Sequence, residues 1–239
     1  MAVQTEFIEL TEEKIEEKNR YFFALIFVAG FFGAFTFCLR GGVFCNAQTG
    51  NLLLASVSLV TGDMPGFWSY FWSLLAYFIG AMLATLFGIL LKKRMALWHM
   101  ILILVEIAAV LALGLLPDAA PVRISQITVN TMAAMQFTTF HKVRGEPMAS
   151  TFCTNHLREA ASALTRWAML PKEKRQRYRF LQHIAMILFF CLGVAVSTLL
   201  GTAFGGKSIW FAVLPLGYVL LSLLFSQKRV KKAKNVGQT

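Results

Sequence analysis

Long uncharged apolar runs constrain this chain more than any other feature of its sequence. One run covers residues 21–39, and two longer runs cover residues 67–91 and 180–204. Each run reaches the roughly 20 residues that a helix needs to cross about 30 Å of hydrocarbon. Hydrophobic residues make up 57% of the chain and charged residues 15%, whereas charged residues make up about 25% of a typical soluble domain. The sequence therefore predicts an all-α, polytopic membrane protein.

An internal duplication divides the chain. Gly41 and Asn51 recur as Gly145 and Asn155, at a spacing of 104. The long helix that follows recurs at a spacing of 113, and the matched pairs are Gly80 with Gly193, Thr85 with Thr198, Leu86 with Leu199 and Gly88 with Gly201. Repetition at a fixed spacing marks structural units. We therefore expect a charged leader (residues 1–20), a first membrane repeat (21–117), a second membrane repeat (118–227) and a basic tail (228–239).

Two polar, glycine-bearing stretches interrupt the apolar pattern at equivalent places in the repeats. We call residues 41–51 the first signature and residues 145–155 the second signature. The apolar segment after the first signature, residues 50–60, would make a helix of about 16 Å, which is half a bilayer. We expect both signature segments to be broken, re-entrant helices, while six other segments cross the membrane. An amphipathic helix on the membrane surface would explain residues 154–167 equally well.

The positive charges favour six spans with both termini in the cytoplasm. In that arrangement 18 of the 23 Lys and Arg residues lie in cytoplasmic loops and tails, and three lie outside. This asymmetry fits the positive-inside rule, so the net charge of +11 indicates membrane topology and no nucleic-acid partner. Because each repeat then has three spans, the second repeat is expected to be inverted relative to the first. If the first signature segment crosses instead, the repeats are parallel.

The signatures are the candidate solute site. A half-helix that starts inside the membrane presents unpaired N–H groups and a positive dipole end, which favour an anionic or zwitterionic group. Small polar side chains beside these ends suit a small polar or anionic solute. The candidate binding residues are Asn46, Gln48, Thr49, Gly50 and Asn51 in the first repeat, and Gln136, Thr151, Thr154, Asn155 and Arg158 in the second. The alternative is that both segments only pack or lie at the lipid interface.

Glu106 is the one carboxylate deep in the apolar run of residues 100–116. A charge at the bilayer centre is costly, so Glu106 should face a partner or a cavity. Arg158 or Arg166 could pair with it, or the acid could be protonated and carry a coupling proton. Glu159 is the second candidate for proton or ion coupling.

A family resemblance rests on three groups of residues. These are Gly30 with Gly41-Gly42-Val43-Phe44 and Thr49-Gly50-Asn51, then Ala133-Ala134-Met135-Gln136, then Thr151 with Thr154-Asn155-His156-Leu157. The pattern resembles the YoaK family of bacterial inner-membrane proteins, a domain of unknown function, over most of residues 21–226. The resemblance implies a multi-pass protein of the bacterial inner membrane and supplies no substrate. Family members often carry an aspartate in the first helix where Gly33 stands here, so any role of that aspartate is lost or moved, for example to Glu106.

Two classes of function remain open from the sequence. The first is a transporter or channel with a mid-membrane site at the two signatures. The second is a membrane enzyme or lipid-handling protein that uses His156, Arg158 and Glu159 at the cytoplasmic face, or a non-catalytic scaffold. The chain has no G-x-S-x-G, H-E-x-x-H or Walker A motif, so we expect no enzyme. The four cysteines have no metal-binding spacing, so we expect no metal or cofactor. The expected partners are the lipid bilayer and a small solute, and a homo-oligomer is left open.

Overall fold

The computed structural model describes residues 21–117, 119–140, 142–143, 146–147, 153–170 and 174–236. Within these residues the chain is helical apart from loops and a two-residue ladder, in which β1 (Lys142–Val143) pairs antiparallel with β2 (Glu146–Pro147). The long helices are the N-terminal helix Tyr21–Leu39, α2 (Gln48–Thr61), α3 (Met64–Leu90), α4 (Met95–Gly114), α5 (Val122–Thr139), α6 (Cys153–Met169), α7 (Lys174–Phe204) and α8 (Val213–Val236). Two 3-10 helices, η2 (Lys92–Arg94) and η3 (Gly205–Ala212), link α3 to α4 and α7 to α8. The predicted all-α class is confirmed.

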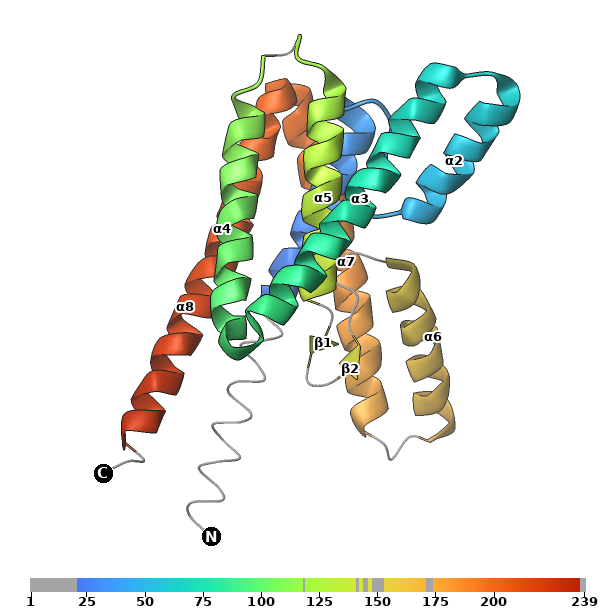
Figure 1. Cartoon of the computed structure of the whole chain (residues 1–239). Coiled ribbons are helices and arrows are strands. Elements are labelled where there is room, and N and C mark those ends of the chain that lie inside the picture. The colour runs from blue at the N-terminus through green and yellow to red at the C-terminus, as the bar shows by residue number, and fades with distance from the viewer. Residues whose placement is uncertain are drawn as a thin grey trace.

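Four segments are long and apolar enough to cross a membrane, namely Tyr21–Leu39, Met64–Leu90, Lys92–Gly114 and Arg175–Lys228. The last of them contains α7, η3 and α8, and η3 turns the chain so that α7 and α8 run in opposite directions (Figure 1). Large apolar side chains face outward, such as Val60 with 88% exposure and Leu214 with 72% exposure. An apolar surface of this extent requires lipid or protein to cover it. The long helices and their apolar surface indicate a helical membrane protein.

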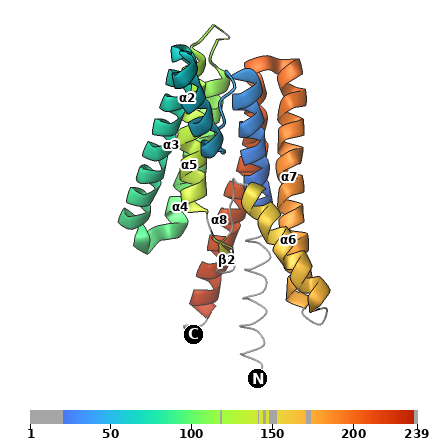
Figure 2. The same cartoon turned by 90° about the vertical axis from the view of Figure 1, so that its right-hand side faces the viewer.

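The N-terminal helix forms the centre of the core. Phe22, Leu25, Phe31, Phe32 and Phe35 on this helix are all at most 1% exposed. Figure 2 shows it between α5 and α7. The first repeat therefore supplies a helix that is covered by both halves of the chain.

α2 and α6 are much shorter than α3 and α7, the helices that they pack against. α2 has 14 residues against the 27 residues of α3, which at 1.5 Å per residue is about 21 Å against about 40 Å. The α2–α3 turn uses Gly62 at a φ of 78°, and Asp63 caps α3 by accepting a hydrogen bond from the Gly66 N–H at 3.1 Å. α2 packs along the part of α3 at the top of Figure 1, and α6 packs along the part of α7 at the bottom (Figures 1 and 2). The N-terminal ends of α2 and α6 lie at mid-height and face each other in both views.

Glycines bring two pairs of helices into backbone contact. A Cβ atom on Gly80 of α3 would lie 2.5 Å from the carbonyl oxygen of Thr131 on α5. A Cβ atom on Gly193 of α7 would lie 2.1 Å from the carbonyl oxygen of Phe27 on the N-terminal helix. Any side chain larger than hydrogen would separate these helices. The spacing of 113 relates Gly80 to Gly193 and the spacing of 104 relates Phe27 to Thr131, so the two crossings match under the sequence duplication.

Candidate functional site

The first signature forms a hydrogen-bonded loop that is held by one side chain. The loop turns at Gly41 and Gly42, whose φ angles are 82° and 73°. Asn51 Nδ2 donates to the carbonyl oxygen of Phe44 at 2.6 Å, and Asn51 Oδ1 accepts from the Phe44 N–H at 3.0 Å. The Asn51 side chain is fully buried. It therefore fastens the loop to the start of α2.

The same network continues onto α5. Gln48 Nε2 donates to Asn130 Oδ1 at 2.9 Å and to the carbonyl oxygen of Cys45 at 3.0 Å, while Gln48 Oε1 accepts from Asn51 Nδ2 at 2.9 Å. Gln126 Nε2, one turn from Asn130, donates to the carbonyl oxygen of Arg40 at 2.7 Å. Irregular backbone at membrane depth requires such internal partners. The polar side chains of α5 therefore stabilise the non-helical loop of the first signature.

The remaining candidates of the first repeat lie around this network. Asn46 is buried and donates from Nδ2 to the carbonyl oxygen of Ala29 at 3.1 Å. Thr49 is exposed, and Gly50 lies against the ring of Phe44. Gln136 takes part in a different contact, a 3.1 Å hydrogen bond from Nε2 to the carbonyl oxygen of Leu25. No side chain caps the start of α2. The N–H groups of Gly50 and Asn51 donate to the carbonyl oxygen of Ala47 at 2.9 and 3.3 Å, so the helix start presents the N–H groups before Gly50 together with the Thr49 hydroxyl.

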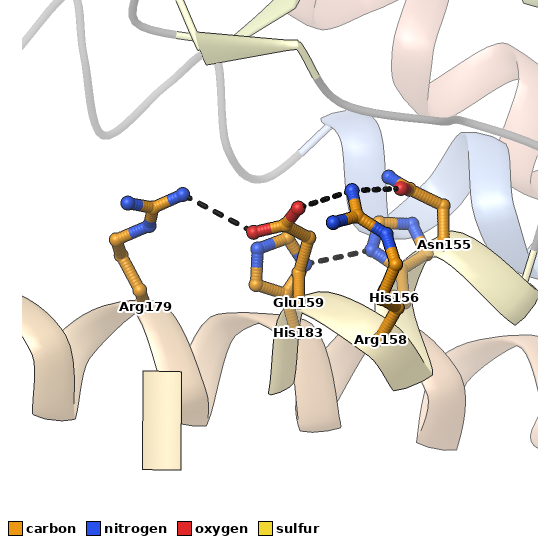
Figure 3. A network of polar contacts seen from close by, with 6 residues as sticks. All are labelled: Asn155, His156, Arg158, Glu159, Arg179 and His183. Atoms are coloured by element: carbon orange, nitrogen blue, oxygen red, sulfur yellow. Dashed lines mark hydrogen bonds and ion pairs between the residues drawn. The ribbon is translucent and has the colours of Figure 1, made fainter. Parts of the chain in front are cut away.

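Two candidates of the second repeat, Asn155 and Arg158, belong to a polar cluster between α6 and α7 (Figure 3). Arg158 Nη2 donates to Asn155 Oδ1 at 3.0 Å and pairs with Glu159 Oε1 at 2.5 Å. Arg179 Nη2 on α7 pairs with Glu159 Oε2 at 3.3 Å. Thr154 is exposed, and Thr151 lies outside the described residues. Glu159 therefore bridges the two helices of this hairpin.

A histidine pair lies beneath these charges. Nδ1 of His156 on α6 lies 2.8 Å from Nδ1 of His183 on α7, and both side chains are buried. One ring nitrogen must donate the proton and the other accept it. Among the residues that the structure describes, no group of three or more His, Cys, Asp or Glu side chains that could hold an ion occurs.

Glu106 lies fully buried on α4. Neither carboxyl oxygen has a hydrogen-bond partner in the described part of the chain. The expected pairing with Arg158 or Arg166 is absent, because Arg158 contacts Asn155 and Glu159 while Arg166 is exposed. An uncompensated buried charge is strongly unfavourable. Glu106 is therefore a buried acid without a polar contact among the described residues.

A cavity of about 300 Å³ lies where the start of the N-terminal helix meets α4, the end of α5 and α8. Its lining includes the rings of Tyr21, His99 and Phe140 and the polar side chains of Ser226 and Gln227. The centroids of the His99 and Phe140 rings are 4.9 Å apart. The sequence analysis missed this cavity, because its lining comes from four helices that are distant in the chain and share no motif.

Comparison with known proteins places the chain in a family but not in a functional class. A family model described as "Protein of unknown function (DUF1275)" matches residues 21–222, in agreement with the resemblance found in the sequence. No curated protein matches the chain, and no solved structure matches it.

Proposed function

The chain belongs to the family of proteins of unknown function DUF1275, and from this premise we propose that it is a six-span membrane transporter for a small polar or anionic solute, built from two inverted halves. The spans are the N-terminal helix, α3, α4, α5, α7 and α8. The helices α2 and α6 re-enter the membrane from opposite sides. Inverted repeats with a discontinuous helix in each half are a recurrent plan of secondary transporters.

Matching elements support the two halves. Under the spacing of 113, α3 (Met64–Leu90) falls on residues 177–203, inside α7 (Lys174–Phe204). The same shift carries η2 (Lys92–Arg94) onto residues 205–207, the start of η3 (Gly205–Ala212). The glycine crossings at Gly80 and Gly193 also match. Equivalent secondary structure and equivalent contacts at constant spacings are expected of a duplicated unit.

The directions of the elements support the inversion. η2 lies at the lower end of the molecule in Figure 1 and η3 at the upper end. α2 runs toward the upper end and α6 toward the lower end. The charges agree, because Lys92, Lys93 and Arg94 lie at the lower end, which the positive-inside rule makes cytoplasmic.

The observation that carries the proposed function is the convergence of the N-terminal ends of α2 and α6 at mid-height (Figures 1 and 2). Each helix start carries about half a positive elementary charge from the peptide dipoles. Two such ends facing each other favour a solute with anionic or strongly polar groups. Because Asn46, Gln48 and Asn51 already bond within the protein, the solute would meet the backbone N–H groups and the Thr49 hydroxyl.

Topology is the first experimental test. Thr61 and Met169 are exposed at the far ends of α2 and α6. We would place Thr61→Cys and Met169→Cys singly in a background without the four native cysteines and label intact cells with a membrane-impermeant thiol reagent. We expect Thr61→Cys to be labelled from outside and Met169→Cys only after permeabilisation. Labelling of both positions from the same side would overturn the inverted arrangement.

Flux is the second test. The purified protein in liposomes would be supplied with radiolabelled inorganic phosphate, acetate, lactate, glycine or glycerol. We expect saturable uptake of at least one solute that falls in a Thr49→Val variant and persists in a Thr85→Val variant, which changes an exposed threonine on α3. Equal uptake by both variants and by the wild type would exclude a solute path at the start of α2.

A further inference from the structure

The cavity at the lower end of the molecule has counterpart positions in the other half, and these are sealed. The spacings of 104 and 113 relate Tyr21 to Ser125, Thr139 to Phe35, and Ser226 to Leu113. Tyr21, Thr139 and Ser226 line the cavity. Ser125, Phe35 and Leu113 are between 0% and 3% exposed. Equivalent residues of the two halves therefore face open space at one end and packed protein at the other.

A tryptophan closes the sealed end. A Cβ atom on Gly114, the counterpart of Gln227, would lie 2.0 Å from Nε1 of Trp210. The same nitrogen donates to the carbonyl oxygen of Leu111 at 3.1 Å, which fixes the indole against the end of α4. The counterpart of Trp210 in the first half is Leu97, which is smaller, and the two side chains are about equally exposed, at 37% and 38%. The difference between the two ends is therefore built from particular side chains.

A second set of contacts holds the sealed end from the side of α5. Gln126, the counterpart of the cavity-lining Phe22, donates to the carbonyl oxygen of Arg40 at 2.7 Å and accepts from Ser69 Oγ at 3.1 Å. These hydrogen bonds join α5, α3 and the end of the N-terminal helix. Water can replace either partner in these hydrogen bonds. The sealed end is therefore closed by polar contacts as well as by apolar packing.

We propose that the 300 Å³ cavity is the cytoplasmic vestibule of the solute path, and that the counterpart positions around Leu113 and Gly114 open to the outside when this vestibule closes. This inference rests on the proposed inverted halves. Two halves with the same fold can exchange their arrangements, so that an opening at one end and a seal at the other change places. Such an exchange moves a solute site between the two sides of the membrane by rocking one half against the other.

The test measures both ends of the molecule in one background. Ser226→Cys reports on the vestibule and Leu113→Cys on its sealed counterpart, each as the only cysteine, labelled by an impermeant thiol reagent in inside-out vesicles and in intact cells respectively. The perturbation is Gly114→Ala, which forces Trp210 away. The control is Gly88→Ala, because a Cβ atom on Gly88 meets nothing within 4 Å.

We expect Gly114→Ala to raise the labelling rate of Leu113→Cys and to lower that of Ser226→Cys, each about tenfold, which corresponds to a two-state equilibrium that moves from about 1:10 to about 10:1. We expect Gly88→Ala to change neither rate. A faster reaction at position 113 with no change at position 226 would show a local disturbance and overturn the proposal. If Gly114→Ala does not fold, Trp210→Phe removes the hydrogen bond to Leu111 and carries the same test.

Failure of this inference is distinct from failure of the proposed function. Labelling of Thr61→Cys and Met169→Cys from the same side would contradict the inverted halves, on which this inference and the proposed function both depend. Labelling from opposite sides, with positions 113 and 226 uncoupled, leaves the inverted halves in place and removes only the exchange of vestibules.

Discussion

Asn51 and Asn155 occupy the same position of the duplicated sequence, and we expect their replacement to have very different effects. Asn51 is fully buried and makes three hydrogen bonds of 2.6–3.0 Å, two with the backbone of Phe44 and one with Gln48. Asn51→Ala leaves the N–H and C=O of Phe44 without these partners. A buried polar group left without a partner costs about 1–3 kcal/mol, so the substitution should cost about 3–5 kcal/mol in total.

The duplicate position supplies the matched control. Asn155 is half-buried and accepts one hydrogen bond, from the exposed Arg158. Asn155→Ala should therefore cost about 1 kcal/mol or less, as for other solvent-exposed contacts to charged groups. The two variants carry the same chemical change at equivalent sequence positions. Any difference between them reports the tertiary environment.

The assay is thermal unfolding in detergent, followed by tryptophan fluorescence. For a chain of this size 1 kcal/mol corresponds to about 2–4 °C in Tm, so Asn51→Ala should lower Tm by about 10 °C and Asn155→Ala by about 3 °C at most. Asn51→Asp serves as a second variant, since it retains the acceptor for the Phe44 N–H but loses the donor to the Phe44 carbonyl. We expect an intermediate Tm. If Asn51→Ala and Asn155→Ala have the same Tm, the inference that Asn51 fastens the loop to α2 is wrong.

Three further predictions concern the helix crossings, the buried acid and the histidine pair. Gly193→Ala should lower stability by about 1–3 kcal/mol, because its Cβ atom would lie 2.1 Å from the Phe27 carbonyl oxygen. The control is Gly217→Ala, whose Cβ atom would meet nothing within 4 Å, and it should leave Tm unchanged or slightly higher. Equal Tm values for the two variants would contradict the close helix crossing. Glu106→Leu should raise stability by about 1–3 kcal/mol, because it removes buried oxygens that have no partner in the described part of the chain, and a lower Tm would reveal a partner. At about pH 3.5, where both rings of the His156 and His183 pair carry a second proton, two N–H donors would face each other, so amide exchange in α6 should be faster than at about pH 7.5. A His183→Phe variant should lose this pH dependence, and persistence of the effect would assign it to other groups.

The helical class and the elements could be predicted from the sequence because their causes are local. The apolar run of residues 67–91 corresponds to α3 (Met64–Leu90), and the run of residues 180–204 lies in α7 (Lys174–Phe204). The short segment after the first signature corresponds to α2 (Gln48–Thr61). Apolar length and turn residues act within a few positions of the chain, so each element can be recognised without its neighbours.

The use of the polar residues could not be predicted in the same way. The spacing suggested equal roles for Asn51 and Asn155, yet Asn51 bonds to the Phe44 backbone and Asn155 to Arg158. The sequence left an arginine partner or a protonated acid open for Glu106, and in the structure neither carboxyl oxygen has a partner in the described part of the chain, while Arg158 pairs with Glu159. A side chain's partners depend on which helices meet it, and that information is not contained in the spacing of residues along one helix.

The sequence alone determined that this chain is helical, apolar enough for a membrane and internally duplicated, because composition, run length and repeat spacing are properties of the chain itself. The tertiary structure decided how the duplicates differ. It buries Ser125 and Leu113 while their counterparts Tyr21 and Ser226 line a cavity. Identical spacings cannot produce that difference, because it depends on contacts between helices, such as Trp210 against Gly114, which exist only once the helices have assembled.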